Sequence, residues 1–318
     1  MLHCHPADQQ ALSWGNRESR TPIREQRTGD IRFGFPARIT SRNGADLTGV
    51  FGTLALLRKA QREHAPDHEV LVAFDGELAS AARVETDPDY KANRADADHS
   101  PIASLPWVKT ALDAIGVRWI EHDTAEGDDT IATLTTRALA EARPVRIMSG
   151  DRDLLQLLTD PAVSVLNRGA PADRRVQTRS DVHARFGVHP GQWPCFRALT
   201  GDPADNIPGI RGVGAVTAAR LLSGGLTLDG LLASDRLVGA VGARIAAHTE
   251  DLRRWRDLIR LEHDVDLPDD LTTGHPTPHL VTAAAILDHL ALWDTTTLNT
   301  PPPDKDRIAC RRRSTGHP

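Results

Sequence analysis

The stretch EGDDTIATLTTRALAEARPVRIMSGDRDLLQLL, residues 126–158, decides the fold. Its first half predicts a helix with acids in the first turn. The segment VRIMSGDRD then predicts a short buried strand that ends in acids, and DLLQLL predicts the start of another helix. Upstream, EVLVAFDGE predicts a further buried strand that stops at Asp75, and a helix precedes it. Strands that alternate with helices predict an α/β domain with a mainly parallel sheet over about residues 31–175.

The rest of the chain differs in character from this domain. Residues 1–30 are polar, Arg-rich and without a sustained period, so we expect a poorly structured segment. Residues 79–101 are polar and of mixed charge, which predicts a mobile or arching segment. Residues 176–300 contain short helical patterns punctuated by Gly and Pro, which predict a second, helical domain. Residues 301–318, a proline run followed by a basic cluster, predict a disordered tail.

The composition is that of a globular protein, with 318 residues of which 40% are hydrophobic and 25% charged. It excludes collagen and disorder throughout, and the 3 cysteines are too few for a disulfide framework. The sequence shows neither an apolar run long enough to span a membrane nor a secretory signal, so we expect a soluble, cytoplasmic protein. The formal net charge of -5 argues against coating of nucleic acid by bulk charge but leaves room for local basic patches.

Carboxylates follow the predicted strands and open a predicted helix, where an open α/β sheet builds its sites. They are Asp75, Glu126, Asp128, Asp129, Asp151 and Asp153, and Asp202 and Asp205 add two more further along. If they converged, their mutual repulsion would require raised pKa values or bound cations, and oxygen ligands select Mg²⁺ or Mn²⁺. Taken singly, each group has a plainer interpretation as a helix cap, a turn residue or a solvated acid.

The stretch LTGDPADNIPGIRGVGAVTAARLL, residues 199–222, predicts a tight hairpin. Gly209, Gly212 and Gly214 permit the turn, and the following helix offers backbone N–H groups to a phosphate. This arrangement indicates a grip on a DNA backbone that does not depend on base sequence.

Five motifs in one order resemble the 5′-3′ exonuclease and flap endonuclease family, which includes the N-terminal 5′-nuclease domain of bacterial DNA polymerase I. They are FDGE at 74–77, YKANR at 90–94, EGDD at 126–129, SGDRDLLQL at 149–157 and GDPADNIPGIRGVG at 201–214. The resemblance implies a PIN-like α/β core with a helical arch, followed by a helix-three-turn-helix (SAM-like) DNA-binding domain.

The resemblance also implies roles for individual residues. The eight acids named above would hold two Mg²⁺ or Mn²⁺ ions. Catalytic contacts in and below the arch would come from Arg83, Tyr90, Lys91 and Arg94, of which the tyrosine would stack on a displaced base. The DNA-binding hairpin, with a K⁺ ion, would comprise Gly209, Ile210, Arg211, Gly212, Val213, Gly214, Thr217 and Arg220.

The sequence departs from the family pattern at its start. Relatives begin with a buried strand that ends in Asp-Gly-Asn, and alignment back from Phe33 reaches Ile23, where no apolar strand precedes. Asp30 lies too near Phe33 to substitute. We therefore expect the strand and its Asp to be absent, residues 1–30 not to fill the place, and activity to be weak or lost. A shifted start of the coding sequence and genuine divergence explain this equally well. A second departure is Val216, where relatives carry Lys.

The leading functional hypothesis is a metal-dependent 5′-3′ exonuclease or flap endonuclease of DNA replication and repair, acting as a monomer on 5′ ends, flaps or branched duplex. Two-metal hydrolysis would leave a 3′-hydroxyl and a 5′-phosphate. One alternative is a catalytically impaired relative that recognises such DNA without cutting it. Another is a PIN-type ribonuclease, which has no reason to carry the hairpin.

Overall fold

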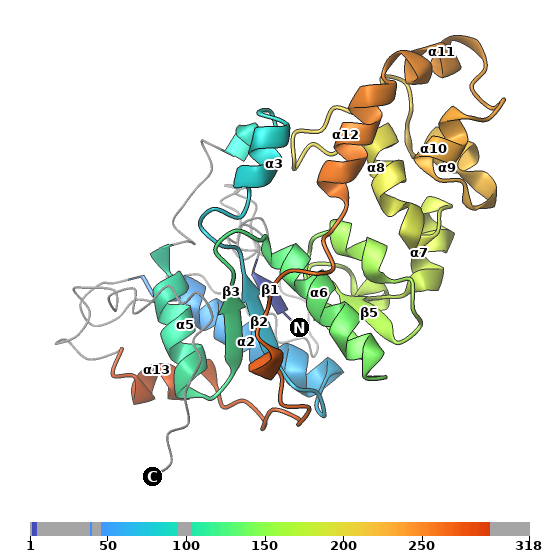
Figure 1. Cartoon of the computed structure of the whole chain (residues 1–318). Helices are drawn as coiled ribbons and strands as arrows, with labels where there is room; N and C mark the ends of the chain where they lie inside the picture. The colour runs from blue at the N-terminus through green and yellow to red at the C-terminus, as the bar shows by residue number, and fades with distance from the viewer. Residues whose placement is uncertain (1, 5–38, 40–45, 95–102, 293–318) are drawn as a thin grey trace, which may run out of the picture.

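Six strands form one sheet among the residues that the structure describes, which are 2–4, 39, 46–94 and 103–292 of this computed structural model (Figure 1). The spatial order is β3-β2-β1-β4-β5-β6. All neighbours run parallel except the last pair, in which β6 is antiparallel to β5. The strands are β1 (Leu2–Cys4), β2 (Leu71–Phe74), β3 (Arg118–Glu121), β4 (Val145–Met148), β5 (Val163–Leu166) and β6 (Val176–Gln177). The predicted mainly parallel sheet is confirmed.

The central strand of this sheet comes from the start of the chain. β1 lies between β2 and β4, with Cys4 paired to Phe74 and Leu2 paired to Met148. The expectation that the first 30 residues leave this place unfilled is therefore wrong. A strand of three residues is too short to show a pattern of alternating apolar residues in the sequence. Its place in the sheet depends on backbone hydrogen bonds to the neighbouring strands, which do not depend on the side chains. The acid implied after the strand has no counterpart, because His5 follows Cys4 in the sequence. His5, Ile23 and Asp30 lie outside the described residues.

Helices cover both faces of the sheet, and the alternation of β2 shows why. Val72 and Phe74 pack with α2 (Thr48–His64), α5 (Leu105–Ala114) and α13 (Ala283–His289). Leu71 and Ala73 point to the other face, into the core that includes α6 (Gly127–Ala140). Because both faces are buried, the strand has no polar position until it ends, and the first polar residue after it is Asp75.

The second domain consists of short helices packed around α8 and α12 (Figure 1). They are α7 (Arg179–Phe186), α8 (Trp193–Thr200), α9 (Ala215–Leu221), α10 (Leu228–Leu232), α11 (Gly239–Ala247) and α12 (Thr249–Ile259). Their apolar side chains continue the core of the α6 side of the sheet rather than forming a separate one. The two domains are therefore joined by a shared hydrophobic core, which fixes residues of the second domain against the sheet edge.

The chain returns to the first domain before it ends, so the helical domain is shorter than the expected 176–300. The Gln61 side chain donates to the Thr277 carbonyl at 2.9 Å, and the Val70 N–H donates to the Thr277 hydroxyl at 2.8 Å. α13 then packs on α2. A helix of this kind gives no sign in the sequence of which domain it covers. The expected tail at 301–318 lies outside the described residues.

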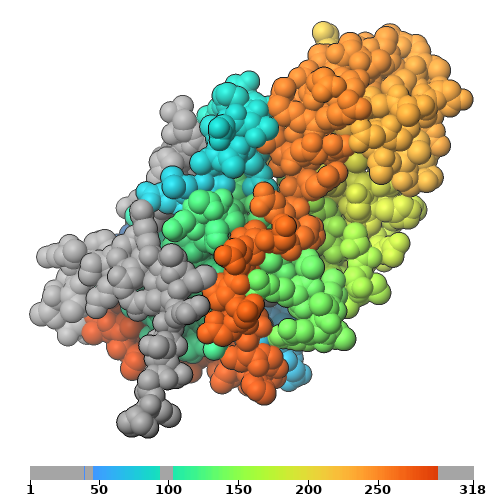
Figure 2. Space-filling view, in the orientation of Figure 1, coloured from blue at the N-terminus to red at the C-terminus, as the bar shows by residue number. Residues whose placement is uncertain are grey.

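The structure describes the first part of the expected arch, which packs against the helical domain (Figure 2). It contains α3 (Ala81–Thr86) and the short helix η1 (Ala92–Arg94). Arg254 of α12 pairs with Asp87 at 3.0 Å, and the Asn206 side chain donates to the Asp89 carbonyl at 2.8 Å. Residues 95–102 of the expected arch are outside the description. Among the described helices, none has the length and apolar character needed to cross a lipid bilayer.

Candidate metal centre and nucleic-acid interface

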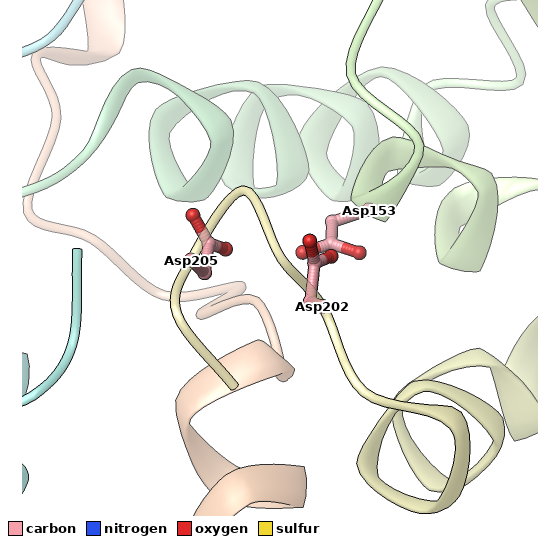
Figure 3. Close-up of side chains that lie close together, drawn as sticks. All are labelled: Asp153, Asp202 and Asp205. Carbon is pink, nitrogen blue, oxygen red and sulfur yellow. The ribbon is translucent and has the colours of Figure 1, made fainter. Parts of the chain in front are cut away.

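Three carboxylates from distant parts of the chain meet at the edge of the sheet (Figure 3). Asp153 begins the short helix η2 (Asp153–Leu157), and Asp202 and Asp205 lie in the loop after α8. One oxygen of each lies within 4.8 Å of the others, and all three residues are buried. Three buried anions at this spacing repel strongly unless protons or cations offset the charge.

Local hydrogen bonds hold this cluster in place. The Trp193 Nε1–H donates to Asp153 at 3.0 Å, and the Ala204 N–H donates to the Asp202 side chain at 2.9 Å. Arg197 of α8 forms an ion pair with Asp202. The loop itself is closed by paired backbone bonds between Asp202 and Ile207, at 2.7 and 2.8 Å. Arg197 and Trp193 were missed by the sequence analysis, and the signal for Arg197 was a basic residue in the last turn of the helix before an acidic loop.

The protonation of Asp153 is strongly affected by its surroundings. Burial raises its pKa well above the ordinary value, and the neighbouring carboxylates of Asp151, Asp205 and Asp202 raise it further. Arg197 opposes the shift. A divalent cation bound beside this carboxylate would stabilise its charged form, because the cation would offset the repulsion from the neighbouring carboxylates.

The acids at the start of α6 divide into two groups. Asp129 accepts two bonds from the Arg83 guanidinium, both at 2.8 Å, and one from the Glu262 N–H at 2.9 Å. Arg83 also lies 3.2 Å from Glu126. Burial lowers the pKa of Arg83, but the hydrogen bonds to Asp129 and the charges of Glu126 and Asp129 outweigh burial and leave this pKa raised. Asp129 therefore braces Arg83, whereas Glu126 and Asp128 line a hollow together with Asp151, Asp153 and Asp205, which we call the acidic hollow.

Asp75 lies at the end of β2, as expected, and its carboxylate accepts the Gly127 N–H at 2.8 Å. This bond ties the end of the strand to the first turn of α6, where the helix presents unsatisfied N–H groups. Five of the eight predicted acids thus line the acidic hollow, and Asp202 joins two of them through the buried cluster. Asp75 and Asp129 are not among the residues that line the hollow. The Asp75 carboxylate instead binds the first turn of α6, and the Asp129 carboxylate binds Arg83.

Three of the four predicted catalytic residues, Arg83, Tyr90 and Lys91, also line the acidic hollow. Lys91 Nζ donates to Glu126 at 2.8 Å and lies 4.9 Å from the centre of the Tyr90 ring. Tyr90 is only 5% exposed, and its hydroxyl lies 3.4 Å from both oxygens of Glu126. The structure therefore places Tyr90 in the core, where burial raises its pKa, rather than on a surface that could stack on a base. Arg94 ends η1, and its side chain is not described.

The predicted hairpin is present between Leu199 and α9. Gly209 has a φ of +65°, and a Cβ there would lie 2.3 Å from the Gly201 nitrogen. Gly212 has a φ of +84°. Gly214, by contrast, has an extended backbone and nothing within 4 Å of the Cβ position. The chain itself therefore requires glycine at positions 209 and 212, whereas its backbone and packing would accept a side chain at position 214, the N-cap of α9.

The hairpin surface contains a mixture of buried and exposed residues. Ile210 and Val213 are buried and anchor the turn, whereas Arg211, Gly212, Gly214 and Arg220 are exposed, with Thr217 half-buried. Val216, the second departure from the expected family pattern, is 85% exposed and contributes little packing. The sequence analysis missed Arg244 of α11, whose Nε–H donates to the Arg211 carbonyl at 3.0 Å and so supports the tip of the hairpin.

Comparison with known proteins agrees with this geometry. The 5′-3′ exonuclease N-terminal resolvase-like domain matches residues 32–187, and the 5′-3′ exonuclease C-terminal SAM fold matches residues 188–279. The chain belongs to the 5′-3′ exonuclease family. The predicted family and the predicted two-domain fold class are thereby confirmed.

Two relatives with similar sequences are longer proteins than this chain. The chain is 38% identical over 259 residues to the thermostable DNA polymerase I of Thermus filiformis, covering 80% of this chain and 30% of that protein. It is 35% identical over 244 residues to DNA polymerase I of Mycobacterium bovis, covering 75% of this chain and 27% of the relative. The chain thus spans under a third of the length of these relatives.

Solved structures share the fold of this chain at lower identity. The T5 D15 protein co-crystallized with metal ions matches with a TM-score of 0.54 and 21% identity, over 66% of this chain and 82% of that chain. The catalytic core of Rad2 in complex with a DNA substrate matches with a TM-score of 0.50 and 13% identity, over 77% of this chain and 81% of that chain.

Proposed function

We propose that this chain is a metal-dependent 5′ nuclease that hydrolyses DNA near a free 5′ end or at a flap junction. The observation that carries the proposal is the buried cluster of Asp153, Asp202 and Asp205, with ligand oxygens within 4.8 Å of one another, next to a hollow that Arg83 and Lys91 also line. Relatives whose names record DNA polymerase I, and solved neighbours with metal ions or DNA, support the same assignment.

The donor set fits a hard divalent cation. All the candidate ligands are carboxylates, which suit Mg²⁺ or Mn²⁺ and not the softer metals that prefer sulfur or imidazole. The raised pKa of Asp153 points the same way, since its charge needs a counter-charge in that place. Asp153, Asp202 and Asp205 would hold one ion, and Glu126, Asp128 and Asp151 would contribute to a second.

The residues of the chain have distinct parts in the proposed reaction. When bound, the ions supply an activated water and neutralise charge on the reacting phosphate. Lys91 and Arg83 present positive charge at Glu126, where they would orient a phosphodiester and stabilise its transition state. The Asp129 carboxylate fixes the Arg83 guanidinium in one orientation, so this charge is preorganised.

The hairpin would hold the duplex. Exposed backbone at Gly212 and Gly214, with Arg211 and Arg220, suits phosphate contacts that do not depend on base sequence. We further propose that K⁺ binds at this hairpin, that the chain acts as a monomer, and that it works in the cytoplasm on replicating or damaged DNA. The presence of the hairpin argues against the hypothesis of a PIN-type ribonuclease, which has no reason to carry it.

One observation favours a second candidate, a DNA-binding relative with impaired catalysis. The sequence after β1 is His5-Pro6-Ala7, so the Asp that the family resemblance implies there is missing. Loss of one ligand would weaken the ion pair and leave the DNA-binding surfaces unchanged.

Cleavage of a 5′-end-labelled flap DNA tests the two candidates. We expect the full chain to release a short labelled fragment in Mg²⁺ or Mn²⁺ and none in EDTA. The variant Asp153→Asn should lose this activity, whereas Asp269→Asn, which changes an exposed acid, should keep it. Tight flap binding without any cleavage in either metal would select the impaired relative.

A further inference from the structure

A second hollow shares Asp151 with the acidic hollow but is otherwise lined by different residues. Its volume is about 200 Å³. Three arginines line it from three separate elements: Arg152 from the turn after β4, Arg174 from the short helix η3 (Ala172–Arg174) and Arg185 from α7. Asn167 and Gln177 also line it. We call it the basic hollow.

The residues that line the basic hollow carry a net positive charge, which favours the binding of an anion. Asp151 is the one acid among its lining residues, against three guanidinium groups. Asp173 lies 3.7 Å from Arg174, but its side chain is 77% exposed and so screens little of that charge. Guanidinium forks with amide donors form the arrangement that binds phosphate oxygens, often with two parallel bonds from one arginine.

The wall of the basic hollow is tied to the metal cluster. The Arg185 guanidinium lies 5.0 Å from the centre of the Phe186 ring, and that ring packs edge-on against Trp193 at 4.9 Å. Trp193 in turn donates its hydrogen bond to Asp153. α7 also contacts α9, the helix that follows the hairpin. A phosphate in the basic hollow would therefore be held at a fixed place beside the proposed cutting site, with which the hollow shares Asp151.

We propose that the basic hollow is a phosphate subsite of the nuclease, separate from the site where the bond is cut. The inference rests on the proposed function and adds to it Arg152, Arg174 and Arg185 as binding residues. The ligand is a phosphate group, which two sources can supply: a phosphodiester of the bound DNA or the 5′-phosphate of a released nucleotide.

Equilibrium binding without cleavage tests the DNA source. The full chain and the variants Arg174→Gln, Arg185→Gln and their double variant are titrated with fluorescent 5′-flap DNA in EDTA, between 50 and 200 mM NaCl, by fluorescence anisotropy. If both arginines meet one phosphodiester, the double variant lowers the slope of log K against log salt by about 0.9 rather than about 1.8. We expect a three- to tenfold loss of affinity at 0.1 M salt. Arg62→Gln, which removes an exposed arginine of α2 outside the hollow, should change neither quantity.

Calorimetric titration with dAMP tests the product source. A weaker affinity for dAMP in the double variant, with the DNA slope unchanged, assigns the subsite to the released nucleotide. A changed DNA slope with unchanged dAMP binding assigns it to the bound strand. If neither quantity changes beyond the effect of Arg62→Gln, the subsite does not exist.

Two further features keep the test decisive. Neither titration requires cleavage, so a chain that cuts no DNA would refute the proposed function while the binding data still judge the basic hollow. Because Arg185 covers Phe186, thermal unfolding of each variant is measured first. If Arg185→Gln unfolds early, Arg174→Gln alone decides, since Arg174 is largely exposed and its replacement leaves the core intact.

Discussion

Replacing Asp153 by Asn should stabilise the protein while it abolishes binding of the ion proposed at Asp153, Asp202 and Asp205. The amide keeps the shape of the side chain, and its oxygen can still accept the Trp193 hydrogen bond. The change removes one negative charge from a buried cluster whose ligand oxygens lie within 4.8 Å of one another. A residue selected for catalysis often lowers stability in this way.

The size of the effect follows from the spacing. Two like charges 4.8 Å apart repel by about 3.5 kcal/mol at an effective dielectric constant of about 20, and Asp153 has two such neighbours. Arg197 opposes this repulsion, so we expect a net gain of about 2 kcal/mol in the free energy of unfolding without divalent cations. For a protein of this size the melting temperature should rise by about 3 °C.

The pH dependence has a definite sign. The folded-state pKa of Asp153 is raised, so the folded protein binds its proton more readily than the unfolded chain does. As the pH falls through this raised pKa, the wild-type chain gains the stability that the variant has at every pH. The difference in stability between the two proteins should therefore be largest near neutral pH and shrink in acid.

Thermal unfolding in EDTA and in 10 mM Mg²⁺, followed by Trp fluorescence, measures these quantities. Mg²⁺ should raise the melting temperature of the wild-type chain more than that of Asp153→Asn, because a cation that binds only the folded state stabilises it and the variant lacks a ligand of one of the two proposed ions. Asp269→Asn serves as the control, since its side chain is fully exposed. A variant that is less stable than the wild-type chain in EDTA would refute the reasoning and would show that Asp153 is part of a favourable ion-pair network.

Three other predictions follow from the site. Arg83→Gln should lower the free energy of unfolding by about 3 kcal/mol, because it leaves the buried Asp129 without its bidentate partner; urea denaturation checks this, and an unchanged midpoint would contradict the brace. Gly209→Val should disrupt the hairpin and lower the melting temperature, whereas Gly214→Val should fold normally and weaken duplex binding at least tenfold; equal melting temperatures would contradict the assignment. His5→Asp adds an acid directly after β1 and should increase Mg²⁺-dependent cleavage of flap DNA in single-turnover kinetics, and an unchanged rate would show that this position supplies no ligand.

The sequence predicted those features that depend on local patterns. The apolar runs ending at Phe74 and Met148 predicted two parallel strands, and the acids after them lie at the expected edge of the sheet. The hairpin was predictable because its glycines serve local backbone geometry at Gly209 and Gly212. β1 was missed, because three residues carry no period and only the ladder to β2 and β4 identifies them as a strand.

Features that depend on contacts between distant segments were not predictable in detail. The split of the α6 acids, in which Asp129 binds Arg83 while Glu126 lines the acidic hollow, requires the packing of α3 against α6 and α12. The same holds for Tyr90, whose place in the sequence suggested a surface residue but whose ring is buried next to Glu126. The support of the hairpin by Arg244 joins residues that are 33 positions apart and belong to no shared motif.

Diffraction from crystals soaked in Mn²⁺ tests the central claim, that this fold assembles a metal centre, most directly. The account predicts an anomalous peak with oxygen ligands from Asp153, Asp202 and Asp205 at about 2.0–2.2 Å, and a second peak about 4 Å away beside Glu126. Crystals of Asp153→Asn should lose the first peak. Absence of any peak at millimolar Mn²⁺ in the wild-type crystals, or peaks only at exposed acids, would contradict the account.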